Sequence, residues 1–284
     1  MLRRIIVPVR GDGMIDTVLG HATALARHHN AHIVVAHCRK RTQDMRPYSR
    51  SLPAFARTTM VEQSQELADQ AEQAVRDQLH EFAQSLDLAE TDTPIRGQAS
   101  IQLVEAYGEM ADVIKLKGRL ADLVVVAKPD RDLNIGTNSL KSALYETGRP
   151  VLMCPREGEI APDFGMRVAV AWNGSLEASR AVAMTLDIVK AASAVTVLTG
   201  GKEEPHGATA EELVEYYRMR GITAEIHRFD AQKPGEVLLA KTTETGASLL
   251  IMGAYGQNQG RETLFGGNTQ AIVDKARIPV AFVH

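Results

Sequence analysis

The 284-residue sequence has little of several features that define particular classes of protein. It has only two cysteines, Cys38 and Cys154, which are too few for a disulfide framework or a zinc ligand set. Each follows an apolar, strand-like run, so we expect two buried free thiols. No apolar run reaches the length of a membrane span, and the run after the basic N-terminus is too short for a signal peptide. We therefore expect a cytoplasmic protein with no membrane partner.

The sequence also lacks a strong charge of either sign. Its formal net charge is −3, with 44% hydrophobic and 24% charged residues, which is ordinary for a globular protein. Without a basic field we expect no nucleic-acid partner. The length is enough for one large domain or two of about 140 residues.

Motifs that carry catalysis are missing as well. There is no Ser-His-Asp spacing, no G-x-S-x-G elbow, no Walker A lysine motif and no recognisable Walker B acid, so we expect no catalytic residues and no motor ATPase. His28, His29, His32, His37 and Cys38 cluster in the sequence. Side chains five apart on a strand face opposite ways, so His32 and His37 should diverge, and we expect no metal site.

What the sequence does contain is an internal repeat. The run Arg4–Gly11 (RIIVPVRG) returns as Arg167–Gly174 (RVAVAWNG), and Gly136-Thr137-Asn138-Ser139 returns as Gly266-Gly267-Asn268-Thr269. Each pair occurs in the same order in the two halves. A stretch rich in proline, glycine and charge, residues 155–165, separates them. This predicts two domains, residues 1–156 and 165–284.

Each half alternates predicted strands with predicted helices. We expect strands near residues 3–9, 32–37, 93–97, 122–127, 150–154, 166–172, 194–199, 222–228, 248–252 and 279–283. Helices are expected near 14–29, 60–86, 100–118, 138–147, 176–192, 207–220, 234–245 and 268–276. Several strands are continuous apolar runs, as in strands buried on both faces. The fold class is therefore α/β, with two tandem doubly wound, Rossmann-like domains of five-stranded parallel sheet packed as a pseudo-dimer.

The long polar segment 61–87 has apolar residues at helical spacing. These are Leu67, Ala71, Val75, Leu79 and Phe82. The pattern predicts a surface helix that turns this whole stripe toward the core.

A ligand is expected beyond the carboxyl ends of the strands, where the strand order reverses. With the order 3-2-1-4-5 in the second half, two strand ends meet there: Ala171 with Asn173, and Met252 with Gly253. The loop GAYGQNQGRETLFGG then leads from Gly253 to the N-terminus of the last helix, which favours anions. Gly266 and Gly267 would let the backbone approach a phosphate, and Asn268 or Thr269 can cap the helix or donate to it. Arg261 can pair with phosphate or stay solvated, and read by itself the glycine-rich loop fits a structural turn equally well.

These residues resemble a known motif. The spacing Gly253-x2-Gly256-x9-Gly266, followed by a small residue and Asn268-Thr269, is similar to the ATP-binding motif of universal stress proteins. Gly267 stands where that family usually has serine or threonine. Asn173, in Trp172-Asn173-Gly174-Ser175, stands where an aspartate that accepts from adenine is usual. The resemblance covers both halves and implies a tandem universal stress protein whose second domain binds ATP, with or without Mg²⁺.

The first half departs further from this motif. Ala127 and Asp130 replace its first two glycines, and Arg10 stands where Asn173 stands in the second half. We expect the first half to bind no nucleotide and Arg10 to pair with Asp130 across the vacant site.

The resemblance implies a stress-response sensor or regulator that binds an adenine nucleotide. Two alternatives stay open: a scaffold that dimerises without nucleotide, which the missing hydroxyl at Gly267 favours, and a weak ATPase. A homodimer of tandem chains is a further option, and protein partners are unknown.

Overall fold

The fold is taken from a computed structural model that describes residues 1–9, 14–39, 54–133, 135–200, 207–230, 234–254 and 267–284. In the first half, the elements are β1 (Arg4–Val9), α1 (Ile15–His29), β2 (His32–Arg39), α2 (Ala54–Ser85), β3 (Ala89–Glu90), β4 (Ser100–Tyr107), α3 (Met110–Gly118), β5 (Leu123–Ala127), α4 (Thr137–Glu146) and β6 (Val151–Cys154). In the second half, they are β7 (Arg167–Ala171), α5 (Leu176–Met184), α6 (Leu186–Ala191), β8 (Ala194–Gly200), α7 (Ala210–Arg218), β9 (Ala224–Phe229), α8 (Pro234–Glu244), β10 (Leu249–Gly253), α9 (Gly267–Lys275) and β11 (Val280–Val283).

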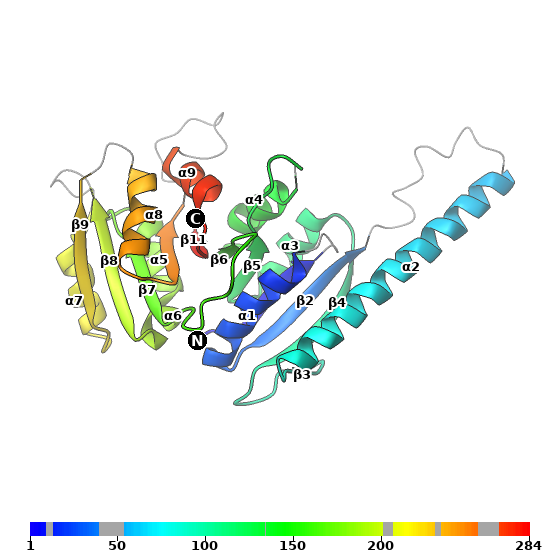
Figure 1. The fold of residues 1–284 in the computed structure, drawn as a ribbon, viewed down its shortest axis with the longest axis horizontal. Coiled ribbons are helices and arrows are strands. Elements are labelled where there is room, and N and C mark those ends of the chain that lie inside the picture. Colours follow the sequence, from blue (N-terminus) through cyan, green and yellow to red (C-terminus); the bar gives the residue numbers. More distant parts are fainter. Residues whose placement is uncertain (10–13, 40–53, 134, 201–206, 231–233, 255–266) are drawn as a thin grey trace.

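The described strands form one continuous sheet in the order β3-β4-β2-β1-β5-β6-β11-β10-β7-β8-β9. Within each half every pairing is parallel, and the halves join where β6 pairs antiparallel with β11, Leu152 facing Ala281. The second half has the predicted order 3-2-1-4-5, and the first half has it too, with the two-residue β3 added at its edge. The prediction of an α/β fold with doubly wound parallel sheets is confirmed, and Figure 1 shows the two halves side by side.

Helices cover both faces of this sheet (Figure 1). On one face, α1, α2, α5 and α7 bury a single apolar cluster that runs through both halves, from Ile5 and Leu79 to Val170 and Tyr217. On the other face, α3, α4, α8 and α9 cover a second cluster that includes Val126, Met153 and Phe282. The continuous strands β5 and β10 are buried on both faces because helices lie above and below them.

One part of the element prediction is wrong. Residues 100–107 form β4 rather than the start of a helix, and residues 93–97 precede that strand instead of forming one. The helix predicted over 100–118 begins only at Met110. β4 pairs with β2 along eight consecutive residues, from His32↔Ser100 to Arg39↔Tyr107, and this pairing outweighs the local helical spacing of its apolar residues.

The stripe predicted on 61–87 is only half right. Val75 and Leu79 are buried, whereas Ala71 is exposed and the Leu67 side chain is 66% exposed. Figure 1 shows why: only the C-terminal half of α2 lies over the sheet, and its N-terminal half projects past the edge. The second half has a smaller departure, because the helix predicted over 176–192 is interrupted at Thr185, whose hydroxyl donates to the Ala181 carbonyl.

The segment between the halves is folded tightly against both. Phe164 is 1% exposed and packs edge-on against His21 of α1, with ring centroids 4.9 Å apart. The Ser248 hydroxyl accepts from the Gly165 backbone N–H and lies 3.0 Å from the Asp163 carbonyl. This connection thus fixes the halves together.

Both cysteines are buried thiols outside any disulfide, as expected, and burial raises the pKa of the Cys154 thiol. Among the described helices none combines the length and the apolar character that a bilayer crossing needs. The described residues also hold no group of three or more His, Cys, Asp or Glu side chains placed to share a metal ion.

Candidate nucleotide-binding site

The strand order of the second half reverses between β7 and β10, as the sequence predicted. The pairing of Val170 with Ile251 brings the ends of both strands together, so that Ala171 and Met252 follow at the same edge. Met252 is 7% exposed and belongs to the second apolar cluster, and the half-buried Ala171 packs against the same cluster.

The turn after β7 is built from its own side chains. The Asn173 Oδ1 accepts from the Ser175 backbone N–H at 3.1 Å, and the Ser175 hydroxyl caps α5 by accepting from Ala178 N at 3.2 Å. Gly174 has φ +72° and lies against the backbone of Gly207 and Ala208, where the Trp172 indole also donates to the Ala208 carbonyl at 2.8 Å. Asn173 itself is exposed, and its Nδ2 forms no hydrogen bond with the described residues.

Gly253 is required by a close approach between β10 and α5. A side chain there would place its Cβ 2.5 Å from the Ala178 nitrogen and 2.5 Å from the Glu177 carbonyl carbon. Such contacts are closer than any Cβ tolerates, so only glycine allows the strand to end beside the first turn of this helix. After Gly253 the chain continues as Ala254, whose N–H donates to the Val283 carbonyl at 2.8 Å.

α9 begins where the glycine-rich segment of the sequence ends. Gly267 and Asn268 are exposed at its start, and a Cβ added to Gly267 would lie within 4 Å of no described atom. Thr269 is only 6% exposed, so its side chain faces inward rather than outward as a donor. The first N–H groups of α9 have no partner within the helix, and its dipole favours an anion there. Gly256, Arg261 and Gly266 lie outside the described residues.

Two features of this region were missed from the sequence. Glu177, in the first turn of α5, is 7% exposed and sits beside Gly253. Gly235, at the start of α8, packs against α9, with an added Cβ 2.9 Å from the Asn268 carbonyl oxygen. Glu177 follows the capping Ser175, which gave a weak signal, whereas Gly235 follows Pro234 and gave none. The contact each makes is between elements distant in the sequence.

The equivalent region of the first half is closed. The Asp130 and Ile135 backbones exchange two hydrogen bonds of 2.9 Å, which folds the connection after β5 into a short turn. The Asp130 carboxylate accepts from Leu133 N at 3.0 Å and lies 3.5 Å from Arg156. Arg10, its predicted partner, lies outside the described residues.

This closed turn also contacts the second half. Lys128 donates to the Ala276 carbonyl, just past the C-terminal end of α9, at 2.9 Å, and Arg131 pairs with Asp274 of α9 at 2.9 Å. Tyr145 of α4 packs edge-on against His284, whose ring lies 3.2 Å from the Ala254 carbonyl. Elements from the first half therefore hold the helix and the strand end that flank the candidate site.

Comparison with known proteins agrees with this geometry. The family model described as the universal stress protein family matches residues 166–284. Those residues form a universal stress protein domain. This domain contains the reversal point, Asn173, Gly253 and α9.

The likeness extends over the whole chain at the level of the fold. A universal stress protein from Archaeoglobus fulgidus superposes with a TM-score of 0.68 at 14% identity, covering 99% of this chain and 97% of its own. A candidate universal stress protein from Pseudomonas aeruginosa gives a TM-score of 0.59 at 16% identity, covering 99% and 93%. Among curated proteins, none matches the chain. The first half thus shares the domain's fold, while the family model matches only the second half.

Proposed function

We propose that this chain is a tandem universal stress protein with domains at residues 1–156 and 165–284, and that only the second binds an adenine nucleotide, with ATP as the first candidate. The observation that supports this proposal is the reversal of strand order between β7 and β10, because Asn173 follows β7 and Gly253 ends β10, from which the chain leads to α9. Doubly wound sheets bind their ligands at such points.

Each part of the crevice suits one part of a nucleotide. The Asn173 amide can donate to and accept from a base edge. The free N–H groups of α9 and the side-chain-free surface at Gly267 suit phosphates, with Asn268 beside them. Gly256, Arg261, Gly266 and the backbone N–H of the buried Thr269 complete the proposed set, with Ala171 and Met252 as the wall. A bound Mg²⁺ would be held mainly by the phosphates.

The first domain serves a different role in this proposal. Its turn from Lys128 to Gly136 is closed by its own hydrogen bonds and is directed against α9, so it supports the site instead of forming a second one. Each chain therefore binds one nucleotide.

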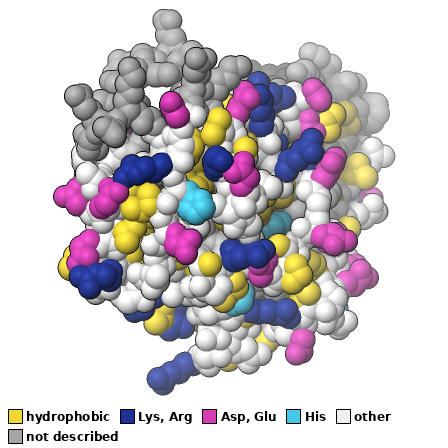
Figure 2. Space-filling model, turned by 60° about the vertical axis from the view of Figure 1, so that its left-hand side comes forward, with side chains coloured by type: hydrophobic (Ala, Val, Ile, Leu, Met, Phe, Trp, Pro, Cys, Tyr) yellow, Lys and Arg dark blue, Asp and Glu magenta, His cyan; other side chains and the backbone are white. Residues whose placement is uncertain are grey.

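A sensor or regulator role in a cytoplasmic stress response fits these features better than turnover. No described residue near the reversal point is positioned as a general base, and the buried Glu177 lies in the first turn of α5, under the strand end. A weak ATPase and a scaffold without nucleotide are the competing functions. Figure 2 shows basic and acidic side chains interspersed over one face of the molecule, which suits protein partners more than a polyanion.

Gly267 offers a direct test. The space around it admits a side chain, so Gly267→Ser restores a hydroxyl donor next to the phosphates. A hydrogen bond to a charged group contributes about 1.5–3 kcal/mol, so we expect about tenfold tighter ATP binding by calorimetry. Gly267→Ala is the matched control, because it adds the same Cβ without a hydroxyl, and its affinity should stay near that of the unmodified protein.

The nucleotide itself is identified by denaturing the purified protein and measuring released adenine compounds by absorbance and mass spectrometry. Absence of released nucleotide, together with no calorimetric binding of ATP with or without Mg²⁺ to either the unmodified or the Gly267→Ser protein, would leave the scaffold as the function. Phosphate release during incubation with ATP separates the sensor from the weak ATPase.

A further inference from the structure

We propose that the first domain carries a second, separate ligand site, at the amino ends of β1, β2 and β4, that binds a small organic anion with a phosphate or carboxylate head group and a short apolar body. A cavity of about 370 Å³ lies there. It is at the edge formed by the amino ends of the strands, whereas the proposed nucleotide site is at the carboxyl ends of β7 and β10. This volume is in the range of small-molecule sites.

The register of the strands builds the floor of this cavity. Arg4 pairs with His32, and His32 pairs with Ser100, so these three side chains form one row across β1, β2 and β4. The next row on the same face contains Val34 and Gln102. The segment from Asp92 to Arg96, which crosses from β3 to β4, forms the wall, and Gln102 donates to the Asp92 carboxylate at 3.2 Å.

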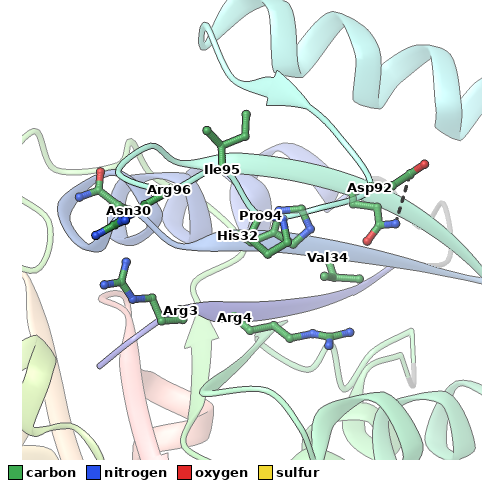
Figure 3. A pocket seen from close by; sticks show the side chains of 10 residues that line it. Arg3, Arg4, Asn30, His32, Val34, Asp92, Pro94, Ile95 and Arg96 are labelled. Atoms are coloured by element: carbon green, nitrogen blue, oxygen red, sulfur yellow. Dashed lines mark hydrogen bonds between the residues drawn. The ribbon is translucent and has the colours of Figure 1, made fainter.

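Three arginines line the cavity, and Figure 3 shows two of them, Arg3 and Arg96, at the same end. Arg3, Arg4 and Arg96 line it, and within the described residues none of their side chains forms an ion pair. Arg3 and Arg4 bind Asp122 only through their backbone N–H groups, at 2.7 and 2.9 Å. Other arginines of the described chain do have carboxylate partners, namely Arg76, Arg131, Arg156, Arg167, Arg218 and Arg228. An anion would relieve the mutual repulsion and accept from the guanidinium forks.

His32 provides an independent sign of a ligand. It is 4% exposed, and its Nδ1 lies 2.8 Å from the Ser100 hydroxyl. Its other nitrogen, Nε2, is buried and forms no hydrogen bond of normal geometry within the described part of the chain, although the Gln102 side chain lies near enough to raise the pKa of the ring. A neutral ring that accepts the Ser100 proton at Nδ1 carries its own proton on Nε2, and that N–H then has the Gln102 side chain beside it but no well-aligned acceptor among the described residues. Buried donors are nearly always satisfied, so a ligand is a natural partner here.

The arrangement of the lining residues sets the ligand's chemistry. Figure 3 shows Arg3, Asn30 and Arg96 grouped at one end, His32 in the centre, and Asp92 at the other end, where it accepts a hydrogen bond from Gln102. Pro94, Ile95 and Val34 supply apolar surface between the ends. The head group would bind among the arginines and Asn30, and the apolar body would lie along Pro94 and Ile95.

The test uses the full chain and three probes at low ionic strength: inorganic phosphate, phenyl phosphate and benzoate. We expect phenyl phosphate or benzoate to bind with a Kd of about 1 mM or tighter, more tightly than inorganic phosphate. The imidazole resonance of His32, assigned by its loss in His32→Gln, should move during the titration, and saturating ATP should leave that movement unchanged.

Two surface variants decide the outcome. Arg3→Ala and Arg96→Ala should each weaken binding at least about fivefold through the loss of a charge-assisted hydrogen bond. Arg180→Ala, an exposed arginine of α5, is the matched control and should bind as the unmodified protein does. Equal affinity in the Arg3→Ala/Arg96→Ala double variant would overturn the proposal, as would a His32 resonance that no probe moves at about 10 mM. Neither result depends on whether the nucleotide site exists, because ATP is used only as a competitor.

Discussion

At the scale of single residues, the candidate site contains two glycines in different surroundings. Gly253 and Gly267 come from the same glycine-rich stretch, yet they do different things. The first lies in van der Waals contact with the backbone of α5, and the second faces open space at the start of α9. The glycine-rich stretch therefore contains one glycine that packing requires, Gly253, and one that we propose for phosphate binding, Gly267.

Replacing each of these two glycines by alanine should affect the stability of the fold differently. Gly253→Ala forces a Cβ to within 2.5 Å of the α5 backbone, so it should lower the free energy of unfolding by about 1–3 kcal/mol, as overpacked cores do. Gly267→Ala is the control, because it meets no described atom and should leave that free energy within about 0.5 kcal/mol of its original value. Urea denaturation followed by circular dichroism measures both. A Gly253→Ala protein as stable as the control would mean that β10 and α5 are not packed so closely.

At the scale of elements, the C-terminal half of α2 is packed on the sheet while its N-terminal half is exposed to solvent. Its apolar residues keep a helical spacing along the whole stripe, but only the part over β2 and β4 finds a surface to cover. Leu79 is 2% exposed and Leu67 is 66% exposed, although both belong to the same periodic pattern.

The two leucines of α2 form a matched pair for mutation. Leu79→Ala removes a buried side chain and should lower the free energy of unfolding by about 2–5 kcal/mol. Leu67→Ala removes an exposed one on the same helix and should change it by no more than about 0.5 kcal/mol. Thermal or chemical denaturation distinguishes them. A comparable loss for Leu67→Ala would show that the projecting part of α2 is covered in solution.

At the scale of the whole molecule, the two halves are held as one body. The sheet crosses from β6 to β11, one apolar cluster runs through both halves, and Phe164 is buried between them. The contacts of Lys128 and Arg131 with α9 and its end add polar links. The free energy of unfolding is therefore a property of the chain as a whole.

Three histidines make that free energy depend on pH. Burial is the main cause that lowers the pKa of His21, His29 and His32 in the folded protein. Smaller effects oppose burial: the Thr17 carbonyl at His21, Asp187 at His29 and the Gln102 side chain at His32. Arg4 beside His32, and Arg3, His28 and the N-terminus near His29, add to the lowering.

The direction of this pH dependence follows from proton binding. Between the lowered folded pKa values and the unfolded value of about 6.5, the unfolded chain binds more protons, so stability falls as pH falls below about 6.5. Each histidine contributes at most about 1.4 kcal/mol per pH unit. Chemical denaturation at a series of pH values should show a shallower slope in His21→Leu than in the unmodified protein. His227→Leu, at an exposed position on β9 away from these three histidines, is the control and should keep the original slope.

The sequence by itself determined the repeat, the doubly wound fold class, the buried cysteines and the position of the reversal point. These features follow from apolar runs and turn residues, because both kinds of signal act between residues that are close together in the sequence. Only the tertiary structure decided that residues 100–107 join β2 as a strand, because that choice depends on a partner 68 residues away. It also decided which part of α2 is buried, and that Arg4, His32 and Ser100 share one row, because strand register brings together residues that have no pattern in the sequence.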